Sequence, residues 1–214
     1  MAVNEVEPAA DLKSVIEDAP ADGTQVTITL TGDIQLTEEL TVAEGKNIVL
    51  DLNGCAVTVP AAVDGRSLYA ITNNGKLLIR DTSAAGNGSI SSRGVQNIGE
   101  GVLTLEGGTI NSIDSNGGGA AVWNEAAFNM SGGTLAFTGT KTDIGSGIAL
   151  NNQADATATI TGGTLRANYA CVFNSGNMNI ENALLTGGDE YWNVIKVFGG
   201  SSLALRNVTV NARY

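Results

Sequence analysis

The sequence predicts an all-β protein: a right-handed parallel β-helix of about eight coils, with three strands per coil and an N-terminal capping helix. The main evidence is a short phrase that recurs along the chain. Its clearest copies read Leu105-Glu-Gly-Gly-Thr-Ile110, Met130-Ser-Gly-Gly-Thr-Leu135 and Ile160-Thr-Gly-Gly-Thr-Leu165. The first apolar residue of each copy serves as an anchor, and anchors recur every 20 to 30 residues at Leu52, Ile79, Leu105, Met130, Ile160, Ile180 and Leu205. A repeat of this length indicates one supersecondary unit per repeat, stacked on its neighbours.

Three short runs of alternating polarity make up each repeat. In the clearest unit they cover residues 120–123, 127–130 and 134–137, separated by Gly, Asn and Ser. Period-two alternation broken by turn residues is typical of strands. A second set of positions precedes the anchors by six residues, or by eight at Ile160, and contains Asn73, Gly99, Asn124, Asn152, Asn174 and Gly199. Asn and Gly suit left-handed turn positions, and stacked Asn side chains can hydrogen-bond from coil to coil.

Residues 1–22 differ from the rest of the chain, which forms the β-helix from residue 23 to residue 214. Leu12, Val15 and Ile16 share one helical face, while Pro8 suits a first helical turn and Pro20 ends the run. The pattern predicts a helix over about residues 8–18. Because a β-helix exposes core and strand edges at an open end, we expect this helix to cap the first coil.

The C-terminal end has no comparable cap in the sequence. The last coil runs through residues 203–205 and 208–210, and only residues 211–214 follow. Exposed core at the end of a solenoid favours association. We therefore expect either further chain, an adjacent domain or a second copy to cover this end.

Composition excludes several classes of partner. The chain has 22 acidic and 11 basic residues, and no basic patch, so we expect no nucleic acid to bind. No apolar run is long enough for membrane insertion, and no signal peptide is visible. Cys55 and Cys171 lie about five coils apart, which predicts two free thiols because a disulfide needs Cα atoms within about 7 Å.

The opening coils carry a resemblance to a known family. Val26-Thr-Ile-Thr-Leu30, Ile48-Val-Leu-Asp-Leu-Asn-Gly54 and the Gly-Gly-Thr phrases resemble the pectate-lyase-like right-handed β-helix proteins. The resemblance is closest to non-enzymatic bacterial surface modules, namely adhesive or carbohydrate-binding β-helix domains. It implies the fold and an extracellular or cell-surface location, but this fold also hosts lyases and hydrolases.

Residues for catalysis are sparse. The chain has no His, which removes Ser-His-Asp triads and His-based zinc sites. Glu106 and Glu181 fall three coils apart, too far for a retaining glycosidase pair. Asp143, Asp189 and Glu190 lie in loops and are interpreted as solvated charges, with a calcium site as the alternative. We therefore expect no catalytic residue, no metal and no cofactor.

A mostly apolar column on the outside of the third strand is the best candidate for a site. If Val122, Leu150, Val172 and Val197 point inward, alternation places Thr72, Ile98, Trp123, Asn151, Phe173 and Phe198 outward. Tyr169 and Trp192 come from nearby segments. Exposed aromatic rings mark binding surfaces, which makes Trp123, Phe173, Phe198, Tyr169 and Trp192 the predicted ligand-binding residues. Burial of the rings under a loop, or against a second copy, is the alternative interpretation.

These observations predict a non-catalytic, secreted or cell-surface β-helix module that binds a glycan, a polysaccharide or another extracellular ligand in the manner of an adhesin. One alternative is a polysaccharide lyase or glycoside hydrolase on the same fold. A third possibility is a structural spacer without a ligand. A homo-oligomer or an adjacent domain would use the C-terminal end or the aromatic face.

Overall fold

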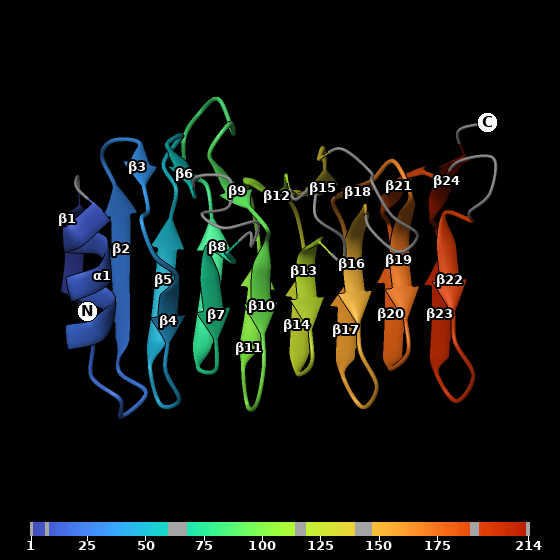
Figure 1. The fold of residues 1–214 in the computed structure, drawn as a ribbon, viewed down its shortest axis with the longest axis horizontal. Coiled ribbons are helices and arrows are strands. Elements are labelled where there is room, and N and C mark those ends of the chain that lie inside the picture. The colour runs from blue at the N-terminus through green and yellow to red at the C-terminus, as the bar shows by residue number, and fades with distance from the viewer. Residues whose placement is uncertain are drawn as a thin grey trace.

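Three parallel sheets wrap around one apolar core and form the right-handed parallel β-helix that the repeat predicts (Figure 1). The structure is a computed structural model of the 214-residue chain, and it describes residues 2–6, 9–59, 68–113, 119–139, 147–188 and 193–212. Each coil passes through sheet A, then sheet B, then sheet C before the chain returns to sheet A. Eight successive coils begin at β2, β5, β8, β11, β14, β17, β20 and β23.

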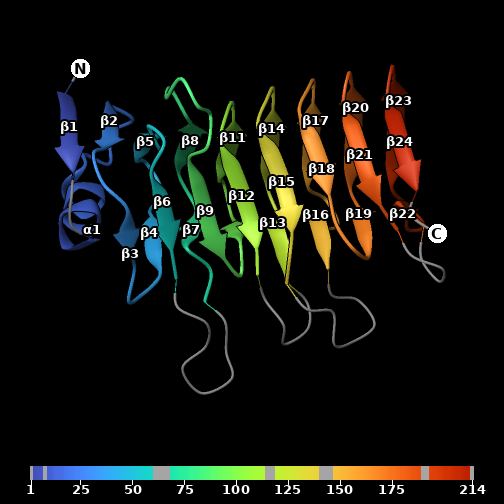
Figure 2. The same cartoon turned by 90° about the horizontal axis from the view of Figure 1, so that it is seen from above.

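The strands of each sheet lie side by side along the solenoid axis (Figure 2). Sheet A contains β1 (Ala2–Val6), β2 (Gln25–Leu30), β5 (Asn47–Asp51), β8 (Lys76–Arg80), β11 (Val102–Leu105), β14 (Ala127–Met130), β17 (Thr157–Ile160), β20 (Asn177–Glu181) and β23 (Ser202–Arg206). Sheet B contains β3 (Ile34–Gln35), β6 (Ala56–Thr58), β9 (Ser89–Ser92), β12 (Thr109–Ser112), β15 (Thr134–Phe137), β18 (Thr164–Arg166), β21 (Leu184–Gly187) and β24 (Thr209–Ala212). Sheet C contains β4 (Leu40–Val42), β7 (Ile71–Asn73), β10 (Val95–Asn97), β13 (Ala120–Asn124), β16 (Ile148–Asn152), β19 (Ala170–Asn174) and β22 (Ile195–Val197).

The predicted anchors stack in one column of sheet A and point into the core. Strand pairing places Ile79, Leu105, Met130, Ile160, Ile180 and Leu205 in register. The prediction of Leu52 as the anchor of its coil is wrong by two residues, since Leu50 pairs with Ile79. Leu52 is nevertheless fully buried, because it lies in the turn just beyond β5 and also faces the core.

The Gly-Gly-Thr phrase forms the turn from sheet A to sheet B, and its two glycines have different roles. A Cβ on the first glycine would strike the preceding coil: at Gly132 it would lie 2.4 Å from the carbonyl oxygen of Glu106. The second glycine has a positive φ, which is 76° at Gly133 and 94° at Gly163. Close stacking of the coils therefore requires the first glycine, and the backbone turn requires the second.

A ladder of buried asparagines joins five coils along sheet C, which confirms the predicted coil-to-coil hydrogen bonding. Each side-chain amide donates to the side-chain oxygen of the next: Asn73 to Asn97 (2.7 Å), Asn97 to Asn124 (2.8 Å), Asn124 to Asn152 (2.7 Å) and Asn152 to Asn174 (2.8 Å). All five side chains are fully buried. Two of the predicted positions are wrong, because Asn97 occupies the place expected for Gly99 and Val197 the place expected for Gly199.

The cause of these two shifts is an alternation in the length of the turn from sheet C to sheet A. Residues 74–75, 125–126 and 175–176 form short turns, whereas residues 98–101, 153–156 and 198–201 form longer ones. Each longer turn closes with its own backbone hydrogen bond, such as the one from Gly101 N to Ile98 O (2.9 Å). Counting six residues back from an anchor therefore finds the inward position only in every second coil.

The predicted helix forms as α1 (Ala9–Asp18) and covers the first coil. Leu12 and Ile16 are buried in the same cluster as the strand residues of the core. The Nζ of Lys46 donates to the carbonyl oxygens of Ile16 (2.8 Å) and Glu17 (2.6 Å), and a cation at the last turn of a helix is favourable. Strand β1, which sequence analysis did not predict, adds a ninth strand to sheet A by pairing with β2.

The last described coil exposes apolar side chains, as expected. Leu205 is 49% exposed and Val210 46% exposed, although the residues in register with them in inner coils, Ile180 and Leu185, are fully buried. Cys55 and Cys171 are free thiols, as predicted. No helix in the described part of the chain is long and apolar enough to cross a membrane.

Candidate functional site

The outer face of sheet C presents two rows of side chains, and together they form the candidate site. The first row follows strand register and contains Trp123, Asn151, Phe173 and Lys196. The second row lies two residues further along each coil and contains Glu125, Gln153, Ser175 and Phe198, whose backbone amides continue the ladder of sheet C. Neighbouring coils are about 4.8 Å apart, so Trp123 and Phe173 stand about 10 Å apart along the axis.

The strand pairing of sheet C shows that two residues were assigned to the wrong row of the predicted column. Ile98 and Phe198 were expected in the same row as Trp123 and Phe173, but Gln96 pairs with Trp123 and Lys196 pairs with Phe173. Ile98 and Phe198 instead begin longer turns and belong to the second row. Val197, which was expected to point inward, continues the column of the asparagine ladder but is 47% exposed because its coil is the last.

Trp123 anchors one end of the site. Its ring is half-buried, and its Nε1 donates to Oε1 of Glu125 at 2.7 Å. This hydrogen bond orients the indole across both rows and satisfies its polar edge, leaving the ring as an apolar platform. Glu125 keeps its second carboxylate oxygen as an acceptor beside that platform.

Aromatic rings gather at the other end of the site. The ring centroids of Phe173 and Phe198 are 5.6 Å apart in an edge-to-face arrangement, and those of Phe173 and Tyr169 are 5.9 Å apart. The Nζ of Lys196 lies 5.4 Å from the centroid of Phe173 and 5.0 Å from that of Phe198. Such cation–aromatic contacts fix the position of the ammonium group over the rings.

Tyr169 takes part differently from the prediction. Its side chain is fully buried in a small cluster with Ala120, Ile148 and Ala170, separate from the main core, and Phe173 packs on this cluster. Tyr169 therefore supports the ring of Phe173 from beneath and offers no surface to a ligand in this structure. Trp192 lies outside the described residues, as do Asp143, Asp189 and Glu190.

Polar side chains bridge the two aromatic ends. Asn151 is the intermediate member of the first row, and Nε2 of Gln153 donates to its Oδ1 at 2.7 Å. The face thus alternates flat rings with planar carboxylate and amide groups. Glu125, Gln153 and Lys196 were not predicted as members of the site. Glu125 and Gln153 each follow an outward residue by two positions, which is a signal of the same face, and Lys196 is in register with Phe173.

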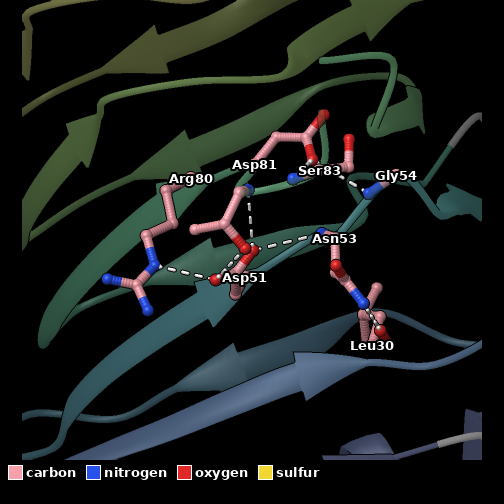
Figure 3. A network of polar contacts seen from close by, with 8 residues as sticks. Leu30, Asp51, Asn53, Gly54, Arg80, Asp81 and Ser83 are labelled. Atoms are coloured by element: carbon pink, nitrogen blue, oxygen red, sulfur yellow. Dashed lines mark hydrogen bonds and ion pairs between the residues drawn. The ribbon is translucent and has the colours of Figure 1, made fainter. Parts of the chain in front are cut away.

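A second polar cluster lies at the turns from sheet A to sheet B (Figure 3). The buried carboxylate of Asp51 accepts hydrogen bonds from Arg80 Nε (3.0 Å), Thr82 N (3.1 Å), Thr82 Oγ1 (2.9 Å) and Asn53 N (3.1 Å). The carboxylate of Asp81 accepts hydrogen bonds from the backbone amides of Gly54, Ser83 and Gly88. Burial acts to raise the pKa of Asp81, but the hydrogen bonds from Ser83, Gly88 and Gly54 outweigh it and hold that pKa below its ordinary value.

The carboxylates of Asp51, Asp81 and Glu181 are thus bound within the fold. Glu106 and Glu181 lie three strand pairings apart, about 14 Å along the axis, and Glu181 forms an ion pair with Arg206. That ion pair holds the pKa of Glu181 below its usual range. Within the described residues, no three Cys, Asp or Glu side chains converge on a position for a metal ion.

No family model, curated protein or solved structure matches the chain.

Proposed function

We propose that the protein is a non-catalytic binding module, secreted or displayed on a cell surface, whose outer face of sheet C binds an extended carbohydrate chain. The observation that carries this proposal is the alternation on one face of flat rings with planar carboxylate and amide groups. The flat ring stacks on the apolar face of a sugar, while a carboxylate or amide engages neighbouring hydroxyl groups. The resemblance to pectate-lyase-like surface modules agrees with this role.

The spacing of the rings favours a chain over a single sugar. Trp123 and Phe173 are two coils apart, and Asn151 with Gln153 lies between them. A linear glycan lying along the solenoid axis would place one sugar ring near each aromatic ring and hydrogen-bond to the half-buried Gln153 in between, whose amide is held by the buried Asn151. Phe198 and Lys196 extend the same surface by one coil.

The chemistry of the described carboxylates supports binding over bond cleavage. A glycosidase needs two carboxyl groups facing one another across a substrate. On this face Glu125 accepts the hydrogen bond of Trp123. At the turns from sheet A to sheet B, the buried Asp51 accepts four hydrogen bonds from the protein. These groups position side chains and turns of the protein itself.

A glycan array probed with the labelled full chain tests the proposal. We expect linear glycans to bind the wild type, Trp123→Ala to lose that binding, and Tyr69→Ala, which removes a half-buried ring outside the two rows, to retain it. The melting temperature of Trp123→Ala should stay close to that of the wild type. Destabilisation by about 3 kcal/mol or more would show that the ring belongs to the core and would contradict the proposal.

Assays for product separate binding from catalysis. The glycans that bind should be recovered intact after incubation with the protein, with and without calcium, as judged by reducing ends and by absorbance of unsaturated uronates. Release of either product by the pure protein would replace this proposal with the lyase or hydrolase alternative.

A further inference from the structure

A single carboxylate holds the backbone of two asparagine–glycine peptides that are distant in sequence. Oδ1 of Asp81 accepts a hydrogen bond from Gly54 N at 2.9 Å, and Oδ2 accepts one from Gly88 N at 2.6 Å. Ser83 N, at 3.0 Å, also donates to Oδ1. Figure 3 shows Asp81 in the same turn as Ser83, beside the turn of the preceding coil that contains Gly54.

The fold demands glycine at both positions. Gly54 has a φ of 83°, and a Cβ on Gly88 would lie 2.6 Å from Cβ of Leu52 and 2.9 Å from the Asp81 carboxyl group. Each glycine follows an asparagine, and Asn53 itself has a φ of 47°, a conformation that asparagine tolerates better than most residues. The turns thus fix the glycine of each pair, and an Asn–Gly pair is chemically fragile.

The fragility of an Asn–Gly pair comes from attack of the glycine nitrogen on the asparagine side chain. A bond forms between that nitrogen and Cγ, the nitrogen gives up its proton, and the bond from Cγ to the side-chain nitrogen breaks to release ammonia. Water then opens the resulting five-membered imide at either carbonyl, giving aspartate or isoaspartate. Isoaspartate lengthens the backbone by one carbon, which a stacked coil with fixed register would not accommodate.

The reaction requires that the glycine nitrogen lose its proton and that it approach Cγ of the asparagine. A carboxylate that accepts a hydrogen bond from this N–H opposes both. Its negative charge disfavours loss of the proton from the nitrogen, and its charge-assisted hydrogen bond prevents the peptide from turning toward Cγ. The side chain of Asn53 is also restrained, because its Nδ2 donates to the carbonyl oxygen of Leu30 at 3.0 Å. Asn53 and Asn87 are both solvent-exposed, so water itself is not excluded from either pair.

We propose that Asp81 protects Asn53 and Asn87 from deamidation, and that these two residues are the sites of spontaneous modification once that carboxylate is lost. The two pairs are neighbours in space: a Cβ on Gly54 would lie 3.3 Å from Oδ1 of Asn87. The side chain of Asp81 therefore holds both pairs, at the place where two adjacent coils turn from sheet A to sheet B.

A third pair provides an internal control. Gly75 follows Asn74, and its backbone amide donates to the buried Oδ1 of Asn73 at 3.3 Å, without contact to Asp81. Its rate of deamidation should not depend on Asp81. Asn116 and Gly117 form a further pair that lies outside the described residues.

Peptide mapping by mass spectrometry after incubation at mildly alkaline pH, below the melting transition, tests the proposal. In Asp81→Asn we expect deamidation at Asn53 and Asn87 to accelerate at least about tenfold, as loss of a hydrogen bond to a charged group implies, with Asn74 unchanged. Asp51→Asn is the matched control, since Asp51 binds the amide of Asn53 but not that of Gly54 or Gly88. Unchanged rates in Asp81→Asn, or equal acceleration at Asn74 or in Asp51→Asn, would overturn the proposal.

A measurement on the wild type avoids any effect of the substitution on folding. We expect Asn53 and Asn87 to deamidate at least about tenfold more slowly in the folded protein than in the same chain unfolded by urea. Equal rates in the two states would overturn the proposal as well.

Discussion

At the scale of single residues, a few polar side chains determine where each coil turns. Asp51 and Asp81 organise two successive turns by accepting backbone amides from neighbouring coils. Asn182 and Asn207 have positive φ at the first of the two turn positions, whereas Gly133 and Gly163 have it at the second. The turn from sheet A to sheet B thus has two backbone forms with different residues, which explains why some copies of the repeat are hard to recognise.

The lowered pKa of Asp81 predicts how its contribution to stability depends on pH. A carboxyl group whose pKa is lower in the folded state stabilises that state at pH values above its unfolded-state pKa of about 4. This contribution is lost as the pH falls through the folded-state pKa. We expect the wild type to melt at a higher temperature than Asp81→Asn at neutral pH, with the gap closing below about pH 4. Thermal melts followed by circular dichroism measure the gap, and a gap independent of pH would contradict this role of Asp81.

The sequence predicted the positions of some side chains at the site correctly and those of others wrongly. Trp123 and Phe173 were placed correctly in one outward row, because alternation alone decides which face a residue occupies. Phe198 was placed in that row, and Lys196 was missed, because the prediction assumed a turn of constant length. The burial of Tyr169 depends on packing between separate coils, for which a single sequence carries no signal.

At the scale of elements, sheet C combines an inner side joined by hydrogen bonds with an outer side that carries the proposed site. The asparagine ladder lies along its inner edge, one residue away from Trp123, Asn151 and Phe173 on the outside. Because each ladder side chain is tied to the next coil, the spacing of the outer rows is fixed before a ligand arrives. Preorganisation of this kind reduces the entropic cost of binding.

Replacing a middle member of the ladder tests its contribution. Asn124→Ala removes a buried acceptor from Asn97 and a buried donor to Asn152. We expect a loss of about 2–4 kcal/mol in the free energy of unfolding, because unpaired buried polar groups are costly. Asn111→Ala, which removes only a surface contact with Thr138, should cost less than about 1 kcal/mol. Similar losses for both variants in urea denaturation would show that the ladder is not a special source of stability.

The repeat pattern predicted the elements well, for a physical reason. Apolar residues with period two and glycines at close contacts between coils are requirements of stacking, so they recur in every coil and reveal the period. The alternation of turn lengths leaves a weaker signal in the sequence, since both kinds of turn are rich in Gly and Ala. Its visible signs are the eight residues, in place of six, that separate Asn152 from Ile160 and Asn97 from Leu105, and only the first of these was recognised.

At the scale of the whole molecule, the two ends differ. The helix α1 covers the core at one end, whereas the last coil exposes Val197, Leu205 and Val210 at the other. Exposed strand edges with apolar side chains favour association. Light scattering at increasing concentration should detect species larger than one chain, and Leu205→Lys should shift this association to higher concentration. A wild type that keeps the mass of one chain at the highest concentration would contradict the expectation.

The central claim is that the outer face of sheet C binds an extended glycan along the solenoid axis. Calorimetric titration with oligosaccharides of increasing length, taken from the best linear glycan on the array, tests it most directly. We predict that affinity rises with length until the chain spans Trp123 and Phe173, and that Trp123→Ala removes this gain. Equal affinity for the single sugar and the long chain, or unchanged binding by Trp123→Ala, would contradict the claim.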